Sequence, residues 1–228
     1  LKQVVARSWE AGASGHVASG GWSADWLLSA YRTTNDDDIQ YVASAIRGRA
    51  YFRNIGRTRR QGLDASVKLK RGGVDARLSY AFTDATYRHS LLLSSPANPM
   101  AGEDGTIEVQ GGDTLPGIPR HSATLSLDYA GTVGGRRWTV GGDLIARSGQ
   151  YLVGDEGNDN ALTPAYAVFD LDTSVKLLPN LRLVAQLRNV LDKRYATFGT
   201  FSEVDDIELA EAPGAERSEE HTSELQSH

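Results

Sequence analysis

Apolar and polar residues alternate with a period of two along most of the chain. The clearest case covers residues 74–83, where every second side chain is apolar and the intervening ones are mostly polar or charged. The apolar set consists of Val74, Ala76, Leu78, Tyr80 and Phe82. Because successive side chains of an extended strand point to opposite faces, this pattern predicts a strand with one apolar and one polar face.

The same period predicts seven further strands, and no segment has a convincing helical period. The further strands are expected over residues 4–14, 22–34, 63–69, 121–129, 138–147, 169–177 and 181–189, with the weakest alternation in the first two. The sequence therefore predicts an all-β chain of about eight strands.

The connections between these strands alternate in length. Tight turns are expected at residues 71–73, 131–136 and 178–180, and longer polar links at 35–51, 89–114 and 154–164. Short turns at one end and long loops at the other are typical of an antiparallel up-and-down transmembrane β-barrel. Tyr129 and Trp138 flank one short turn, where the aromatic girdle of such a barrel would lie.

Soluble sandwiches and lipocalin-like barrels are an alternative, because they share the alternation and turn their apolar face inward. Two features favour the membrane barrel. Residues 57–70 and 74–90 form segments longer than the mean strand of about five or six residues. The polar faces carry full charges, such as those of Asp75 and Arg77, and must meet water, so the opposite faces meet lipid or a core.

Composition excludes several classes of function. The 228 residues include no cysteine, so neither disulfides nor thiolate metal sites can form. With 24 Lys and Arg against 29 Asp and Glu, the net charge of −5 offers no basic footprint for nucleic acid. No apolar run approaches the roughly 18 residues of a membrane-spanning helix. No catalytic motif or histidine pair at metal-ligand spacing occurs, so we expect no catalytic residue, metal or cofactor.

Three motifs carry a family resemblance: RNIGRTRRQGLDASVKL (53–69), LPGIPRHSATLSLDY (115–129) and LRNVLDKRYATFG (187–199). Together they resemble the C-terminal barrel of TonB-dependent outer-membrane receptors. The Asn-Val-Leu-Asp-Lys-x-Tyr run of the third is the most telling, and LKQVVARSWEAGASG at the start resembles an upstream strand of the same family. The resemblance covers nearly all of residues 1–215.

This resemblance implies an incomplete fragment of a barrel of about 22 strands around a plug domain. It implies energised uptake of an iron chelate, such as a siderophore complex, or of a similar scarce nutrient across the outer membrane of a Gram-negative bacterium. Outer-membrane lipid and the TonB system, acting through the N-terminal plug that is absent here, would be the partners. Leu1 in place of Met, without a leader, predicts a start internal to a longer chain.

The long links would supply ligand contacts in such a receptor. Aromatic, imidazole and carboxylate groups lie in or beside them, and the expected ligand-binding residues are Tyr51, Tyr87, His89, Tyr151 and Asp155. Two alternatives stay open. A passive porin would share the alternation but not the Asn-Val-Leu-Asp-Lys-x-Tyr run, and a small eight-stranded outer-membrane barrel, enzyme or adhesin, would need no missing part.

Several local features predict strand geometry or charge placement. Gly56 permits a bend or bulge, and Arg57–Arg60 are expected to be solvated in the lumen rather than bound to lipid phosphates. Asn189 and Asp192 are expected to cap the bend from strand to loop. The acidic runs at 36–38 and 154–160 are expected to be solvated loops; the second lacks the ligand spacing of a calcium loop.

The last twelve residues, RSEEHTSELQSH, break the pattern. They resemble the translation of a common sequencing-library adapter, codon by codon through Ser227. We therefore expect a barrel segment over residues 1–216 and a non-native tail over residues 217–228.

Overall fold

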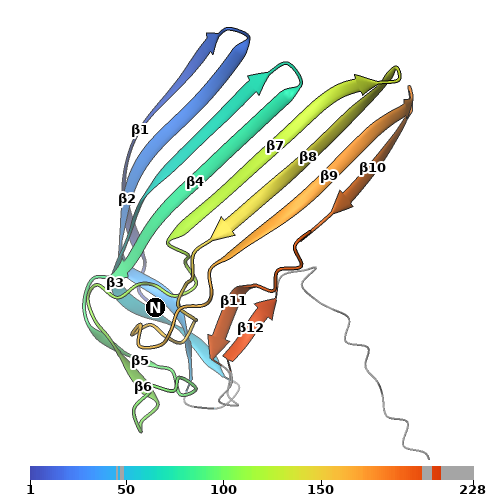
Figure 1. Ribbon diagram of the computed structural model, residues 1–228. Coiled ribbons are helices and arrows are strands. Elements are labelled where there is room, and N and C mark those ends of the chain that lie inside the picture. The colour runs from blue at the N-terminus through green and yellow to red at the C-terminus, as the bar shows by residue number, and fades with distance from the viewer. Residues whose placement is uncertain (45, 47–48, 202–206, 212–228) are drawn as a thin grey trace, which may run out of the picture.

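The computed structural model describes residues 1–44, 46, 49–201 and 207–211. All regular structure within them is β-strand, and eight strands form one antiparallel sheet, which confirms the predicted fold (Figure 1). In sheet order these are β1 (Val5–Ser19), β2 (Trp22–Ala43), β3 (Ala50–Arg71), β4 (Val74–Tyr87), β7 (His121–Val133), β8 (Arg136–Arg147), β9 (Tyr166–Leu178) and β10 (Leu181–Leu187). The expected tail at 217–228 lies outside the described residues.

The sheet is an up-and-down meander, because neighbours in space are consecutive in the chain except for one insertion between β4 and β7. That insertion carries the small hairpin of β5 (Leu91–Ser94) and β6 (Thr106–Val109), and β11 (Ala196–Phe201) pairs with β12 (Ile207–Glu211) after the last long strand. Figure 1 shows one curved wall with both hairpins gathered at one end, which we call the loop end. The opposite end is the short-turn end.

The register brings like residues into rows across the sheet. One row is apolar throughout and runs Leu69, Ala76, Leu127, Gly142 and Leu171. The next row, one residue along, is polar and runs Lys68, Arg77, Ser126, Asp143 and Asp170. The alternation seen in the sequence therefore becomes two chemically distinct faces.

The apolar face is exposed. On β4 it extends from Val74 to Phe82, a span of nine residues that matches the 9–11 of a membrane-spanning strand. Leu127 and Tyr129 at its centre and edge are each 54% exposed. An apolar face of this size is stable against lipid but not against water, which disfavours the soluble alternative. None of the described residues forms a helix long and apolar enough to cross a membrane.

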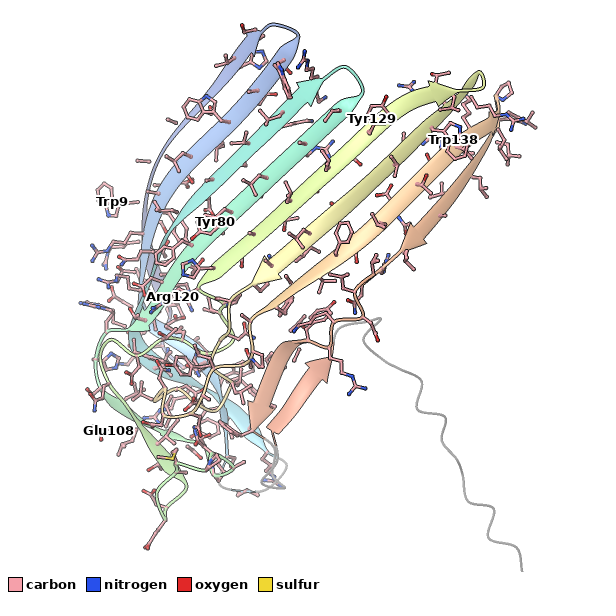
Figure 2. All side chains as sticks on the ribbon, viewed as in Figure 1. Trp9, Tyr80, Glu108, Arg120, Tyr129 and Trp138 are labelled. Carbon is pink, nitrogen blue, oxygen red and sulfur yellow. The ribbon has the colours of Figure 1, made fainter. Side chains whose placement is uncertain are left out.

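Glycine turns close the short-turn end. The turn expected at 131–136 is shorter in the structure and consists of Gly134 and Gly135 alone. Their φ angles of 58° and 74° suit a two-residue hairpin. Tyr129 and Trp138 lie beside this turn at the edge of the apolar face, as predicted (Figure 2). Arg71 stacks over the ring of Trp22 at the same end, 5.1 Å from its centroid.

The link expected over residues 35–51 is mostly strand, so that prediction was wrong. β2 continues to Ala43 and β3 begins at Ala50. The ladder is interrupted at two adjacent points: Asp36 and Asp37 are inserted between the pairs Asn35–Thr58 and Asp38–Gly56, and Ile55 is inserted before the next pair, Ile39–Asn54. The bulge predicted at Gly56 is thereby confirmed. Beyond the apolar face both sides of the hairpin can be polar. The strand therefore continues without the alternation of apolar and polar residues by which a strand is predicted.

Candidate functional site at the loop end

The loops at one end of the sheet form a compact assembly with its own core. Links 88–120 and 148–165 fold against the extended ends of β2, β3 and β4 (Figure 1). The buried apolar side chains of this core are Val42, Ile55, Ala85, Tyr87, Leu93, Ile107, Val109 and Leu115. Burying each of the larger ones contributes about 1.5–3 kcal/mol, so these loops have a fixed shape rather than a set of open conformations.

Hydrogen bonds fasten the two long links to each other. Asn158 accepts from the backbone N–H of Thr114 at 2.6 Å and donates to its carbonyl at 2.9 Å. Ser95 and Asn98 both donate to the carbonyl oxygen of Gly154 at 2.7 Å. A displacement of either link would therefore strain the hydrogen bonds that hold the other.

A buried polar chain joins the sheet to the second link. The hydroxyl of Tyr87 donates to Gln40 Oε1 at 2.6 Å, and Gln40 Nε2 donates to Glu156 Oε1 at 2.7 Å. The backbone N–H of Gly154 also donates to this oxygen, at 3.2 Å. Burial raises the pKa of Glu156 to about 6, because the charged form loses its hydration.

The carboxylate of Asp155 is hydrogen-bonded by other residues of the acidic run 154–160. It accepts from the backbone N–H groups of Asp159 and Asn160, at 3.1 and 3.2 Å, and from Asn160 Nδ2 at 2.9 Å. Asp155 and Glu156 are buried, so the expectation of a fully solvated run was wrong. Among the residues that the structure describes, no three His, Cys, Asp or Glu side chains gather closely enough to hold a metal ion.

The first acidic run, 36–38, sits at the bulge of β2 rather than in a loop. Asp36 is held between Arg7 and Arg57 at 2.5 and 2.6 Å. Asp38 is buried and accepts from Thr58 at 2.5 Å, from Arg60 at 2.9 Å and from Asn35 at 3.2 Å. These carboxylates pair with neighbouring strands, so the expectation of a solvated loop was wrong here too.

The five predicted ligand residues fall into two groups. Tyr87 and Asp155 are buried within the loop assembly, whereas Tyr51 and His89 are exposed on its surface. Tyr151 is half-buried and lines a cavity of about 230 Å³ between the two long links. The structure therefore brings Tyr87 and Asp155 into one hydrogen-bonded assembly and leaves the other three with surface that a ligand can reach.

The cavity beside Tyr151 also contains residues that the sequence did not single out. Arg120, His121 and Gln150 contribute polar groups, and Ile118 and Leu162 contribute apolar walls. Gln150 is buried and donates from Nε2 to the carbonyl of Thr197 at 3.1 Å. Nothing in the spacing of loop residues indicates which of them fold toward one another, so no sequence signal identified this cavity.

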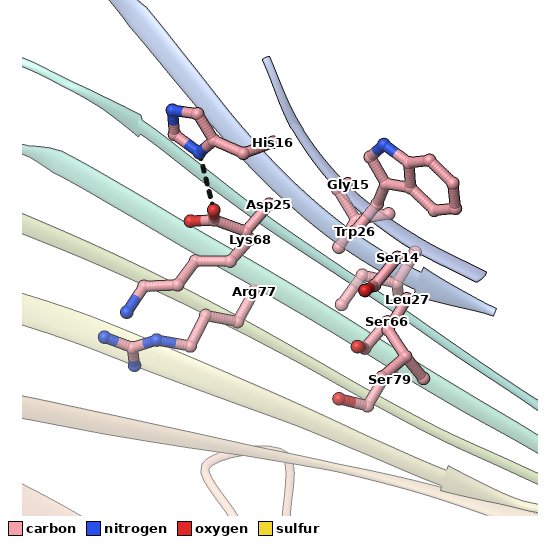
Figure 3. Close-up of a pocket in the computed structure, with 12 residues that line it drawn as sticks. Ser14, Gly15, His16, Asp25, Trp26, Leu27, Ser66, Lys68, Arg77 and Ser79 are labelled. Carbon is pink, nitrogen blue, oxygen red and sulfur yellow. Dashed lines mark hydrogen bonds and ion pairs between the residues drawn. The ribbon is translucent and has the colours of Figure 1, made fainter. Parts of the chain in front are cut away.

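The polar face of the sheet contains a second hollow, of about 630 Å³, near the short-turn end (Figure 3). Its walls carry His16 and Asp25, joined at 2.6 Å, with Lys68 and Arg77 beside them. A face with this density of charge needs water or another polar surface against it. This is the arrangement of a barrel lumen.

The Asn-Val-Leu-Asp-Lys run has the predicted geometry. Asn189 and Asp192 both adopt a positive φ of 48°, which these side chains tolerate better than most. Asn189 Oδ1 accepts from the N–H of Lys193 at 2.9 Å, and its Nδ2 donates to the carbonyl of Lys193 at 3.0 Å. The motif therefore forms the capped bend at which β10 becomes loop.

Comparison with known proteins gives the family. A family model described as TonB dependent receptor-like, beta-barrel, matches residues 1–190. The ferric-pyoverdine M114 receptor PbuA of Pseudomonas sp. (strain M114) is 27% identical over 201 residues, which cover 88% of this chain and 22% of that protein.

Solved structures agree on the fold. The siderophore receptor PiuA from Acinetobacter baumannii is 18% identical with a TM-score of 0.65 over 91% of this chain, and BauA, the ferric preacinetobactin receptor of the same species, is 17% identical with a TM-score of 0.60 over 90%. The matched parts are 26% and 27% of those chains. The chain thus spans about a quarter of the length of its relatives.

The porin and small-barrel alternatives lose their support, because the matching family is one of receptors. The alternating faces, the exposed apolar band, the capped Asn-Val-Leu-Asp-Lys bend and the match over residues 1–190 all agree. The chain belongs to the TonB-dependent receptor-like β-barrel family and forms part of the wall of an outer-membrane barrel of a Gram-negative bacterium.

Proposed function

We propose that the whole receptor takes up a ferric siderophore or a comparable iron chelate across the outer membrane, with energy from TonB delivered through an N-terminal plug. This chain contributes about eight strands of the barrel wall and the loop assembly above them. The family match over residues 1–190 carries the proposal. The names of the relatives add to it, since PbuA, PiuA and BauA are a ferric-pyoverdine, a siderophore and a ferric preacinetobactin receptor.

The ordered loop assembly suits a binding role. We assign Tyr51, His89 and Tyr151 to direct contact with the chelate, because their side chains retain exposed surface. We assign an indirect role in binding to Tyr87 and Asp155. Their hydrogen bonds hold the loops on which the contact residues lie. Preorganised loops reduce the ordering cost of binding and so favour affinity.

Transport by the full-length receptor tests this proposal. We would express the source gene in a Gram-negative strain that lacks its own siderophore receptors and measure uptake of radioactive iron supplied as a panel of ferric siderophores, with and without TonB. Uptake of at least one chelate that depends on both the receptor and TonB is the expected result. Uptake that persists unchanged without TonB, or none with any iron chelate, would refute the proposal.

Loop variants of the same receptor test the site. Alanine substitution of Tyr151 or His89 is expected to weaken chelate binding about tenfold, the loss typical of one good aromatic or polar contact. Trp138→Ala, at the opposite end of the sheet, is the matched control and should leave binding unchanged. Equal affinity of all three variants and the parent would remove these residues from the site.

A further inference from the structure

The inner, polar face of the sheet has a recessed half and a raised half. Two adjacent rows of side chains, followed in register across the strands, show the division. One row runs Ser14, Leu27, Ser66, Ser79, Thr124, Ile145 and Val168, and the next row towards the loop end runs Gly12, Ser29, Asp64, Ala81, Ser122, Arg147 and Tyr166. From β1 to β7 these residues are small apart from Leu27 and Asp64, whereas those of β8 and β9 are branched, long or aromatic. The wall is therefore recessed over β1–β7.

Two hollows occupy this recessed half. The hollow of about 630 Å³ beside His16 and a second of about 330 Å³ share Leu27, Ser66 and Ser79, so they are continuous. Ser66 and Ser79 are paired in register, and Figure 3 shows their side chains next to each other. We call the two hollows together the serine-lined recess.

Strand parity separates the arginines of the run Arg57–Arg60. Arg60 lies on the inner face of β3 and donates to Asp38 at 2.9 Å, whereas Arg59 shares the outer face with Leu63. The expectation that the whole run lies in the lumen is therefore wrong for Arg59. None of these four residues lines the serine-lined recess.

The lining of the recess suits a hydrated solute better than a packed protein surface. The hydroxyls at its centre belong to Ser14, Ser66, Ser79, Ser122 and Thr124. A hydroxyl both donates and accepts hydrogen bonds, so this lining can replace the water around an oxygen-rich molecule. Among the described residues that line its inner face, Leu27 is the one apolar side chain larger than alanine. Contacts between protein surfaces are apolar at their centre, and a plug seated here would find few apolar partners.

The charges on the short-turn side of the recess are paired with one another. His16 and Asp25 lie 2.6 Å apart, and Asp75 lies 3.1 Å from Arg77 and 4.0 Å from Lys68. Because each cation has an acidic neighbour, this end presents no concentrated charge of one sign that would retain a passing ion. A route for transport needs sites that bind weakly enough to release the solute.

We propose that the serine-lined recess is the stretch of barrel wall along which a hydrophilic, oxygen-rich iron chelate passes towards the short-turn end of the whole receptor. The larger hollow, of about 630 Å³, has the size of small-molecule sites, which span roughly 300–1,000 Å³. The raised half on β8 and β9 is left to contact the plug. This route presupposes the uptake function proposed above and adds the chemistry of the solute and the part of the wall that it follows.

Bulky substitutions in the full-length receptor test the recess. Ser79→Trp fills its centre and is expected to lower the maximal rate of TonB-dependent iron uptake at least about fivefold, while the affinity for the chelate at the cell surface changes less than about twofold. Ser79→Ala keeps the recess open and should retain the rate of the parent. Ile145→Trp, in the same row but outside both hollows, is the matched control and should also retain it.

Two results of this experiment would overturn the proposal. One is an unchanged maximal rate in Ser79→Trp, and the other is an equal loss of rate in Ile145→Trp, which would mean that any added bulk in the lumen blocks uptake. If Ser79→Trp does not bind the chelate and so has not folded, Ser66→Trp on the neighbouring strand takes its place with the same expected result.

Leakage through the barrel separates a free recess from one that the plug fills. A plug packed into the recess would be displaced by Ser79→Trp and would admit a large polar antibiotic such as vancomycin without TonB. We expect the vancomycin sensitivity of the parent, and an increase would overturn the proposal. Failure of the proposed function is distinct, because the parent would then take up no chelate at all. Failure of the route alone leaves uptake by the parent intact and equal in Ser79→Trp.

Discussion

His89 occupies the space that a side chain at Gly56 would need. Gly56 has a φ of 73°, and a Cβ atom built on it would overlap the imidazole ring. The loop after β4 therefore rests on the bulge of the β2–β3 hairpin through one glycine.

Gly56→Ala should loosen this contact. The left-handed backbone costs a non-glycine residue about 1–2 kcal/mol, and the imidazole must also move away. We expect faster proteolysis within residues 88–120 of the folded receptor. Gly72→Ala, a positive-φ glycine with open space around it, carries the backbone strain without the clash. If both variants open this link equally, the contact with His89 has no role.

Glu156 should make the loop assembly sensitive to pH. Its pKa in the folded state is about 6, above the ordinary 4.5, so the folded state favours the protonated carboxyl. The resulting stabilisation, up to about 2 kcal/mol, is fully present below about pH 4.5 and is lost as the pH rises through 6. Hydrogen exchange of residues 148–165 should therefore be slower at about pH 4.5 than at about pH 7.5, after correction for the intrinsic rate.

Glu156→Gln should remove this dependence, because the amide keeps the acceptor oxygen but cannot ionise. Protection at neutral pH should rise to the level seen in acid. Glu108→Gln, an exposed position in the other long link, is the control and should leave the pH profile unchanged (Figure 2). A profile identical in all three proteins would exclude Glu156 as its source.

Asp38 should stabilise the bulge through the hydrogen bonds that its carboxylate accepts from Asn35, Thr58 and Arg60. Replacing it with asparagine leaves Arg60 without its charged partner and is expected to cost about 2 kcal/mol. Asp37→Asn is the matched control, because that neighbour is more exposed and, among the described residues, its carboxylate reaches only Lys2, at 4.0 Å. Denaturant unfolding of the full-length receptor would measure both, and an equal change in stability would contradict the prediction.

The two faces of β7 should respond oppositely to charge. Leu125 lies in the middle row of the apolar band and Thr124 on the polar face beside it. A lysine at Leu125 is expected to cost about 2–4 kcal/mol of folding free energy in lipid vesicles. A lysine at Thr124 should cost little, since it meets an aqueous lumen. Similar losses at both positions would mean that the faces have been assigned incorrectly.

The eight strands of the sheet could be predicted from the sequence because contact with lipid requires every second residue to be apolar. Positions such as Leu78 and Leu125 in the apolar band must be apolar, so the period of two is visible in the sequence. Beyond the band the requirement ends, and the strand from Asn35 to Ala43 was predicted as loop. The hairpins β5–β6 and β11–β12 are too short for a period to be recognised.

The burial of loop residues could not be predicted in this way. Tyr87 and Asp155 were selected for their chemistry, as groups suited to a ligand, and nothing local indicated that they lie inside the loop assembly. Their burial depends on contacts with residues far along the chain, such as the link from Tyr87 through Gln40 to Glu156.

The length of the β2–β3 hairpin determines how far this part of the barrel wall extends beyond the apolar band. From Leu63 to Ala50 the strand continues for about 43 Å along its path, and ladder hydrogen bonds hold it for most of that distance. Inserting one residue into both arms would turn every side chain beyond it to the opposite face, moving Tyr51 and Ile55 to the wrong sides. The reach of this hairpin can therefore change during evolution only in increments of two residues per arm, unless a further bulge restores the register.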